Sequence, residues 1–149
     1  MLYQKQLFRH APEKGIYGDC YRTALACILD ERTDQVPHFY DKGVEAEEAL
    51  QHIRKWMSRR GLALITTTFD GGGVGQDARH LEEVLGAVAH HNPNMPFLLS
   101  GRSPSGCNHT VAFDHGKMWD PSPANGGIVG PTAPDGFYWV EFIGLKFRS

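Results

Sequence analysis

Residues 109–120 read His-Thr-Val-Ala-Phe-Asp-His-Gly-Lys-Met-Trp-Asp. Two short apolar runs flank an Asp-His-Gly segment, a pattern that predicts an antiparallel hairpin with a tight turn. If His115 and Gly116 form a two-residue turn, His109 lies on the same sheet face as Asp120, one diagonal step away. Diagonal neighbours are about 7–8 Å apart at the backbone, within reach of an imidazole and a carboxylate. A turn one residue longer or shorter would put the two side chains on opposite faces of the sheet.

The rest of the chain predicts helices mostly before strands. An irregular arm covers residues 1–18, and a helix with one apolar stripe begins near Asp19 or Cys20, with Asp19 as its expected N-cap. Further helices are predicted over residues 44–60 and 77–91, and strands over residues 62–69, 96–100 and 137–143. This order is typical of an α+β fold with N-terminal helices packed on a C-terminal antiparallel sheet. At 149 residues the chain predicts a single domain over 1–149.

Composition excludes several classes of function. The net charge of −2 argues against a nucleic-acid partner, and no apolar run reaches the length of a membrane span. The start of the chain has no charged lead followed by an apolar core, and the three cysteines are too few for a disulfide framework. We therefore expect a cytoplasmic protein. Neither His90-His91 nor Cys107-x-His109 has the paired spacing of a zinc site, so no metal or organic cofactor is expected.

Gly18-Asp19-Cys20 opens the first predicted helix. A thiol in the first turn faces unpaired backbone N–H groups and the positive end of the helix dipole, which favour the nucleophilic thiolate. A buried structural cysteine is the alternative, and Cys27, two turns further along the helix, fits that description well.

A cysteine at a helix start, a strand histidine and a later aspartate resemble the papain-like cysteine peptidase superfamily. The chain is most similar to small phage-type proteins with an early Gln, Gly-(Asn/Asp)-Cys, Val-Pro-His-Phe, Ser-Pro, a strand His and Asp-Pro. The corresponding residues are Gln6, 18–20, 36–39, Ser103-Pro104, His109 and Asp120-Pro121. The resemblance implies a papain-like fold with Cys20 as nucleophile, His109 as general base and Asp120 as the residue that orients it.

One position departs from the superfamily pattern. Papain-like peptidases place an oxyanion-hole Gln about six residues before the cysteine, where this chain has Lys14. The backbone N–H of Cys20 can supply one donor, and Gln6 is our choice for the second because it matches the early Gln of the phage-type group. Gln4 and Asn108 are alternatives, and Gln6 as a surface residue is another.

These expectations predict a thiol hydrolase, a cysteine peptidase or amidase, that cleaves an amide or isopeptide bond without a cofactor. A peptide, a protein conjugate or a small amide would suit the triad, with the host cytoplasm as the location if a phage encodes the chain. One alternative is an acyltransferase or transglutaminase-like enzyme of the same fold. Another is a non-catalytic phage binding module.

Overall fold

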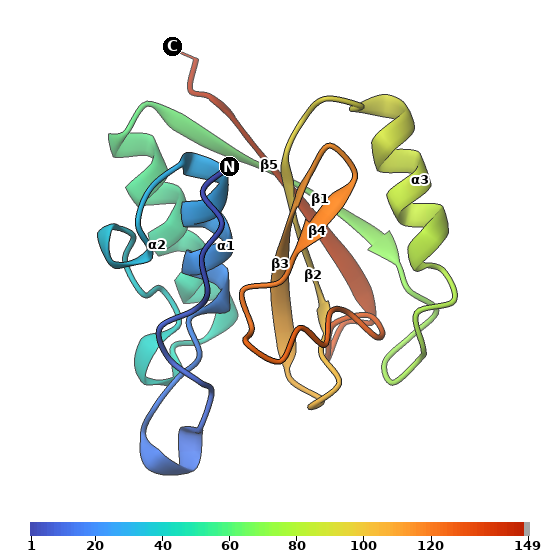
Figure 1. The fold of residues 1–149 in the computed structure, drawn as a ribbon, viewed down its shortest axis with the longest axis horizontal. Helices are drawn as coiled ribbons and strands as arrows, with labels where there is room; N and C mark the ends of the chain where they lie inside the picture. The colour runs from blue at the N-terminus through green and yellow to red at the C-terminus, as the bar shows by residue number, and fades with distance from the viewer. Residues whose placement is uncertain (148–149) are drawn as a thin grey trace.

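The computed structural model describes residues 1–147 and shows an α+β architecture (Figure 1). All strand pairs of its five-stranded sheet are antiparallel, and the strand order is β1-β5-β2-β3-β4. The strands are β1 (Leu62–Asp70), β2 (Phe97–Arg102), β3 (Asn108–Asp114), β4 (Lys117–Trp119) and β5 (Phe137–Leu145). The α-helices are α1 (Cys20–Leu29), α2 (Ala46–Arg59) and α3 (Leu81–His91).

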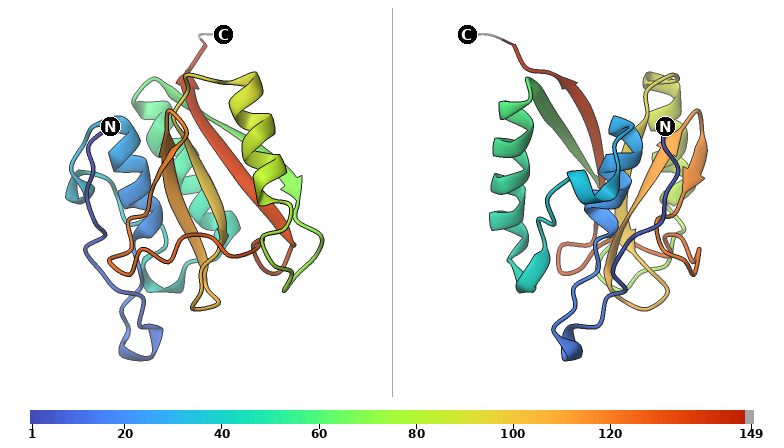
Figure 2. Two further views of the ribbon diagram at one scale, coloured as in Figure 1. Left: turned by 45° about the vertical axis from the view of Figure 1, so that its right-hand side comes forward. Right: turned by 60° about the vertical axis from the view of Figure 1, so that its left-hand side comes forward.

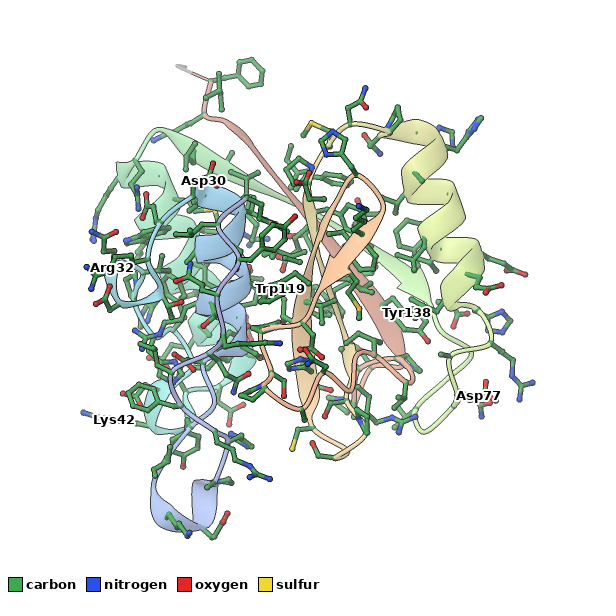
Figure 3. The ribbon with its side chains drawn as sticks, in the orientation of Figure 1. Asp30, Arg32, Lys42, Asp77, Trp119 and Tyr138 are labelled. Atoms are coloured by element: carbon green, nitrogen blue, oxygen red, sulfur yellow. The ribbon has the colours of Figure 1, made fainter. Side chains whose placement is uncertain are left out.

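The helices cover both faces of the sheet (Figure 2). One apolar core joins α1 and α2 to Leu98 and Ala112, and a second joins α3 to Leu99, Val111 and other residues of the opposite face. Successive residues of a strand point to opposite faces, so β2 and β3 contribute alternate side chains to the two cores. Trp119, labelled in Figure 3, packs against the first core where the sheet meets α1.

The hairpin between β3 and β4 has the predicted register. Ala112 faces Trp119, and the turn residues His115 and Gly116 both have positive φ values, of 50° and 77°. Two successive residues with positive φ are typical of the type I′ turn that matches the twist of a hairpin. Because β4 pairs with only the last three residues of β3, no strand of the described residues covers the edge of β3 beside His109.

The structure corrects two details of the sequence interpretation. Helix α3 begins at Leu81 instead of Asp77, because the Asp77 carboxylate accepts hydrogen bonds from the backbone and guanidinium of Arg79 and forms a turn there. As the sequence predicts, this helix lies between β1 and β2 in the chain. Asp19 precedes α1 as predicted, but its side chain does not cap the helix.

None of the helices in residues 1–147 has both the length and the apolar character that a membrane span requires.

Two glycine substitutions test the packing of the sheet. A Cβ at Gly101 would clash with Ile128 and lie 2.7 Å from the Gly130 carbonyl oxygen, which Arg102 N–H already binds at 2.8 Å. We expect Gly101→Ala to lower the free energy of unfolding by about 1–3 kcal/mol, because the tethered segment cannot move aside freely. Gly86→Ala, on the exposed side of α3 with no atom near its added Cβ, should instead raise it by about 0.5–1 kcal/mol. Urea denaturation measures the free energy of unfolding of both variants. Equal changes in the two would contradict the close packing at Gly101.

Candidate active site

Cys20 is the first residue of α1, and its side chain is half-buried. The helix packs across β3, which brings its N-terminus to the uncovered edge of that strand. Of the other cysteines, Cys27 is buried in the core and Cys107 is exposed in the turn between β2 and β3. All three are free thiols, and only Cys20 lies at a helix start.

His109 and Asp120 form a buried pair. The Nε2 atom of His109 lies 2.7 Å from Oδ1 of Asp120, and the two residues are 8% and 4% exposed. The pair joins the start of β3 to the residue that follows β4, as the two-residue turn predicts. Because Nε2 is occupied, Nδ1 is the ring nitrogen that remains for Cys20.

The charge of His109 depends on both neighbours. Burial alone would lower its pKa, but the hydrogen bond to Asp120 and the interactions with Cys20 raise the pKa from 6.5 to about 10. His109 is therefore charged at neutral pH, and it lines the same cleft as Cys20.

The Asp120 carboxylate is held from three directions. Oδ1 accepts hydrogen bonds from His109 and from the backbone N–H of Ser122, and Oδ2 accepts one from Gly127 N–H at 2.8 Å. Burial alone would raise the pKa of Asp120, but these hydrogen bonds hold it below its ordinary value. Asp120 therefore stays ionised at neutral pH and fixes the orientation of the His109 ring.

Asp19 binds the N-terminal arm to the start of α1. Its carboxylate is 1% exposed, and it accepts hydrogen bonds from the backbone N–H groups of Leu7 and Phe8 and from the Arg22 guanidinium. The sequence suggested a helix cap at this position. The observed role is to hold the arm directly beside Cys20.

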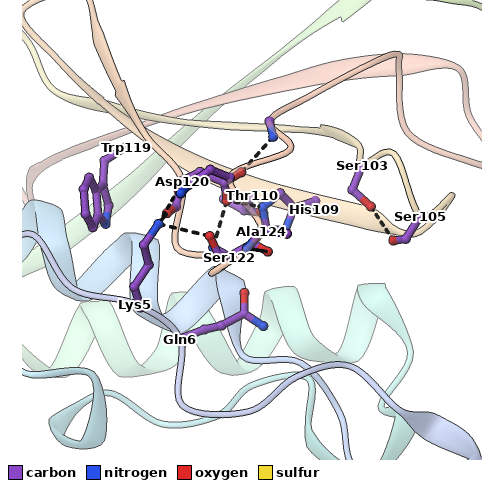
Figure 4. Close-up of polar contacts among 12 residues, drawn as sticks. Lys5, Gln6, Ser103, Ser105, His109, Thr110, Trp119, Asp120, Ser122 and Ala124 are labelled. Carbon is purple, nitrogen blue, oxygen red and sulfur yellow. Dashed lines mark hydrogen bonds and ion pairs between the residues drawn. The ribbon is translucent and has the colours of Figure 1, made fainter.

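Gln6 lies in the arm and points toward the segment that carries Asp120 and Ser122 (Figure 4). Its backbone N–H donates to Pro121 O at 2.9 Å, and its side-chain Nε2 donates to Phe8 O at 2.6 Å. The Oε1 atom is buried and has no hydrogen-bond partner among the described residues. Gln6 is therefore held in the site, and one Nε2 hydrogen remains for a ligand.

The alternative oxyanion donors both bind backbone groups, although Asn108, unlike Gln4, also lines the cleft. Gln4 binds Glu31 O and Thr33 N–H near the far end of α1, and both polar atoms of the Asn108 side chain bind the backbone of Ala133. Lys14 is exposed in the short 3-10 helix Pro12–Lys14 of the arm, away from the cleft.

A cleft of about 1200 Å³ opens over these residues. It lies between the arm, α1, α2 and the sheet, and its walls also include the turn between β2 and β3. The short motifs of the sequence meet here, since the cleft is lined by Gln6, Gly18, Asp19, Cys20, His38, Ser103, Pro104, His109 and Asp120. His38 is anchored through Nε2 to Tyr17 O, so the Val-Pro-His-Phe motif serves as a structural turn at the rim.

The sequence pattern alone did not indicate Glu141 as an acidic residue of this cleft. Glu141 is a buried carboxyl in the middle of β5 that lines the cleft and accepts a hydrogen bond from Tyr21. The only indication in the sequence is an acidic residue within an otherwise aromatic and branched strand. No group of three or more His, Cys, Asp or Glu side chains in residues 1–147 is arranged to hold a metal ion.

Comparisons of the chain with protein-family models, with curated proteins and with solved structures give no match. What the site can do therefore follows from its own geometry and chemistry.

The charge of His109 makes stability depend on pH. Because its pKa is raised from 6.5 to about 10, the stabilisation is fully present below the lower value and is lost as the pH rises through the upper one. His109→Gln lacks this stabilisation at every pH, so its deficit in the free energy of unfolding should shrink as the pH rises. Urea denaturation of both proteins at about pH 6, 8 and 10 measures the deficit. A deficit that is constant across these conditions would contradict the assignment.

Proposed function

We propose that the protein is a thiol hydrolase of papain-like fold that cleaves an amide or isopeptide bond. The observation that carries the proposal is the buried His109–Asp120 pair, at 2.7 Å, which lines the same cleft as Cys20 at a helix start. A nucleophile, a base and a residue that orients the base are the three parts of a nucleophilic catalytic triad.

The first half of the reaction forms an acyl-enzyme. The Cys20 thiolate attacks the substrate carbonyl carbon, and the resulting oxyanion accepts hydrogen bonds from Cys20 N–H and Gln6 Nε2. As the C–N bond breaks, the His109 imidazolium donates its Nδ1 proton to the leaving amine, which departs neutral. The products of this step are a thioester at Cys20, a free amine and a neutral His109.

Water completes the cycle. Neutral His109 removes a proton from the water as its oxygen attacks the thioester carbonyl, and the C–S bond breaks to release the acid and the Cys20 thiolate. Asp120 stays ionised throughout and stabilises the imidazolium at the start and the end of the cycle. No metal or organic cofactor takes part in this sequence of steps.

The clustering of the phage-type motifs supports the same proposal. Gln6 and Cys20 are far from His109 and Asp120 in the sequence, yet all four line one cleft. A binding module has no need for an activated thiol beside an imidazolium, so the reactivity of Cys20 separates that alternative from a hydrolase. An acyltransferase would use the same acyl-enzyme and an amine in place of water.

Brief labelling with iodoacetamide tests the nucleophile. We expect Cys20 to react on the order of ten times faster than Cys107, because an unactivated thiol is only a few per cent thiolate at neutral pH. If accessibility alone governed the rate, the exposed Cys107 would react before the half-buried Cys20, and buried Cys27 would react last. Peptide mass mapping measures the three rates. In His109→Ala the advantage of Cys20 should disappear, and faster labelling of Cys107 in the wild-type protein would contradict the proposal.

Substitutions at the site should differ in the size of their effects. With a substrate drawn from a panel of activated amides and esters, Cys20→Ala should abolish turnover, and His109→Ala should be nearly as damaging because the two groups act as a unit. Asp120→Asn should cost less, since it removes neither reacting group. Gln6→Ala should lower kcat about 10²–10³-fold as the loss of an oxyanion donor. Steady-state kinetics measures each effect.

Gln4→Ala is the matched control for Gln6, because it removes an arm glutamine that does not line the cleft. It should retain near wild-type kcat. Full activity in Cys20→Ala would exclude the thiol mechanism, and an unchanged kcat in Gln6→Ala would exclude Gln6 from the oxyanion hole.

A further inference from the structure

The sheet face toward α1 changes from apolar to polar along the strands. Leu98 and Ala112 lie opposite each other and belong to the core, whereas two residues further along Ser100 lies opposite Thr110, with their hydroxyl oxygens 2.8 Å apart. A sheet face buried under a helix is normally apolar. The polar end therefore forms a wall of the cleft, which both hydroxyl side chains line.

Glu141 lies where the apolar core meets this polar wall. In its row of the sheet it is flanked by Leu98 on β2 and Thr66 on β1. Its side chain lines the cleft although the residue is only 4% exposed. A carboxylate at this depth is separated from bulk water, where its charge would be solvated.

The described residues fill only about half of the hydrogen-bond acceptor positions of the Glu141 carboxylate. Oε1 accepts a hydrogen bond from the Tyr21 hydroxyl and Oε2 one from the Thr66 hydroxyl, each at 3.1 Å, whereas a carboxylate has about four acceptor positions. No Lys, Arg or His in residues 1–147 forms an ion pair with it. Burial raises the pKa of Glu141 above its ordinary value, although the hydrogen bonds from Thr66 and Tyr21 and the charge of Arg54 act in the opposite direction.

Two tyrosines connect Glu141 to the nucleophile. Tyr21 follows Cys20 in α1 and binds Glu141 directly, and its ring centroid lies 5.7 Å from that of Tyr40. Burial, with the charges of Glu141 and Cys20, raises the pKa of Tyr40 to about 12. Glu141, both tyrosines and Cys20 all line the same cleft.

We propose that Glu141 determines substrate specificity by binding an ammonium or guanidinium group that the substrate carries beside the scissile amide. The inference rests on the proposed hydrolase function and names the class of substrate. A cation that enters the cleft supplies the missing counter-charge, and the faces of Tyr21 and Tyr40 add a favourable surface for it. A neutral substrate leaves the buried carboxylate unpaired and is therefore selected against.

Irreversible probes test this without knowledge of the natural substrate. Dipeptidyl vinyl sulfones alkylate an active-site thiol by conjugate addition, and they can carry lysine or its uncharged near-isostere norleucine at either position. We expect Cys20 of the wild-type protein to react at least about tenfold faster with the best lysine probe than with the matching norleucine probe. A ratio near one or below it at both positions overturns the proposal.

Two variants with the same change in net charge locate the effect. Glu141→Gln should reduce the lysine-to-norleucine ratio to about one, whereas Glu47→Gln, at an exposed carboxylate of α2 that also lines the cleft, should keep the wild-type ratio. A ratio that survives in Glu141→Gln, or that falls equally in both variants, overturns the proposal. Because the wild-type ratio is itself decisive, the test stands even if Glu141→Gln does not fold.

The rates at which Cys20 reacts with these probes also test the hydrolase proposal, separately from the role of Glu141. Slow reaction of Cys20 with every probe contradicts the activated thiol. Fast reaction of Cys20 without preference for the cation contradicts only the role of Glu141.

Discussion

The carboxylate of Asp120 is the point on which the geometry of the site depends. It binds His109 at the start of β3 and two backbone N–H groups of the segment that follows β4. Lys5 adds a second connection, because its ammonium donates to the carbonyl oxygens of Asp120 and Ser122. The hairpin, the loop after it and the N-terminal arm therefore all contact Asp120. These contacts fix the orientation of the His109 ring.

A second buried carboxylate, that of Asp19, holds the N-terminal arm in place. Asp19 holds the backbone of Leu7 and Phe8 against the start of α1. The segment around Gln6 is thereby fixed at both ends, by Asp19 and by the bond from its own N–H to Pro121 O. Gln6 therefore lines the same cleft as Cys20 although it lies fourteen residues before it, because the intervening chain loops outward.

Near the proposed triad, one face of the sheet contributes both to the apolar core and to the wall of the cleft. Leu98 and Ala112 close the core beneath α1, and Ser100 and Thr110 face the cleft on the same strands. Glu141 lies at the boundary between the two environments. Apolar packing thus gives way to polar side chains where the sheet enters the cleft that Cys20 also lines.

Local pattern determined much of this protein from the sequence alone. Alternating apolar residues around His115-Gly116 specified the hairpin and its register, and the register placed His109 beside Asp120 because the strand period is two. Periodic apolar residues located α1 and α2, and the start of α1 identified Cys20. Tertiary structure alone decided that Asp19 holds the arm, that Gln6 lines the cleft and Gln4 does not, and that Glu141 is buried with no ion-pair partner among the described residues. These features join residues that are far apart in the chain, and no local periodicity encodes which distant groups meet when the two cores close.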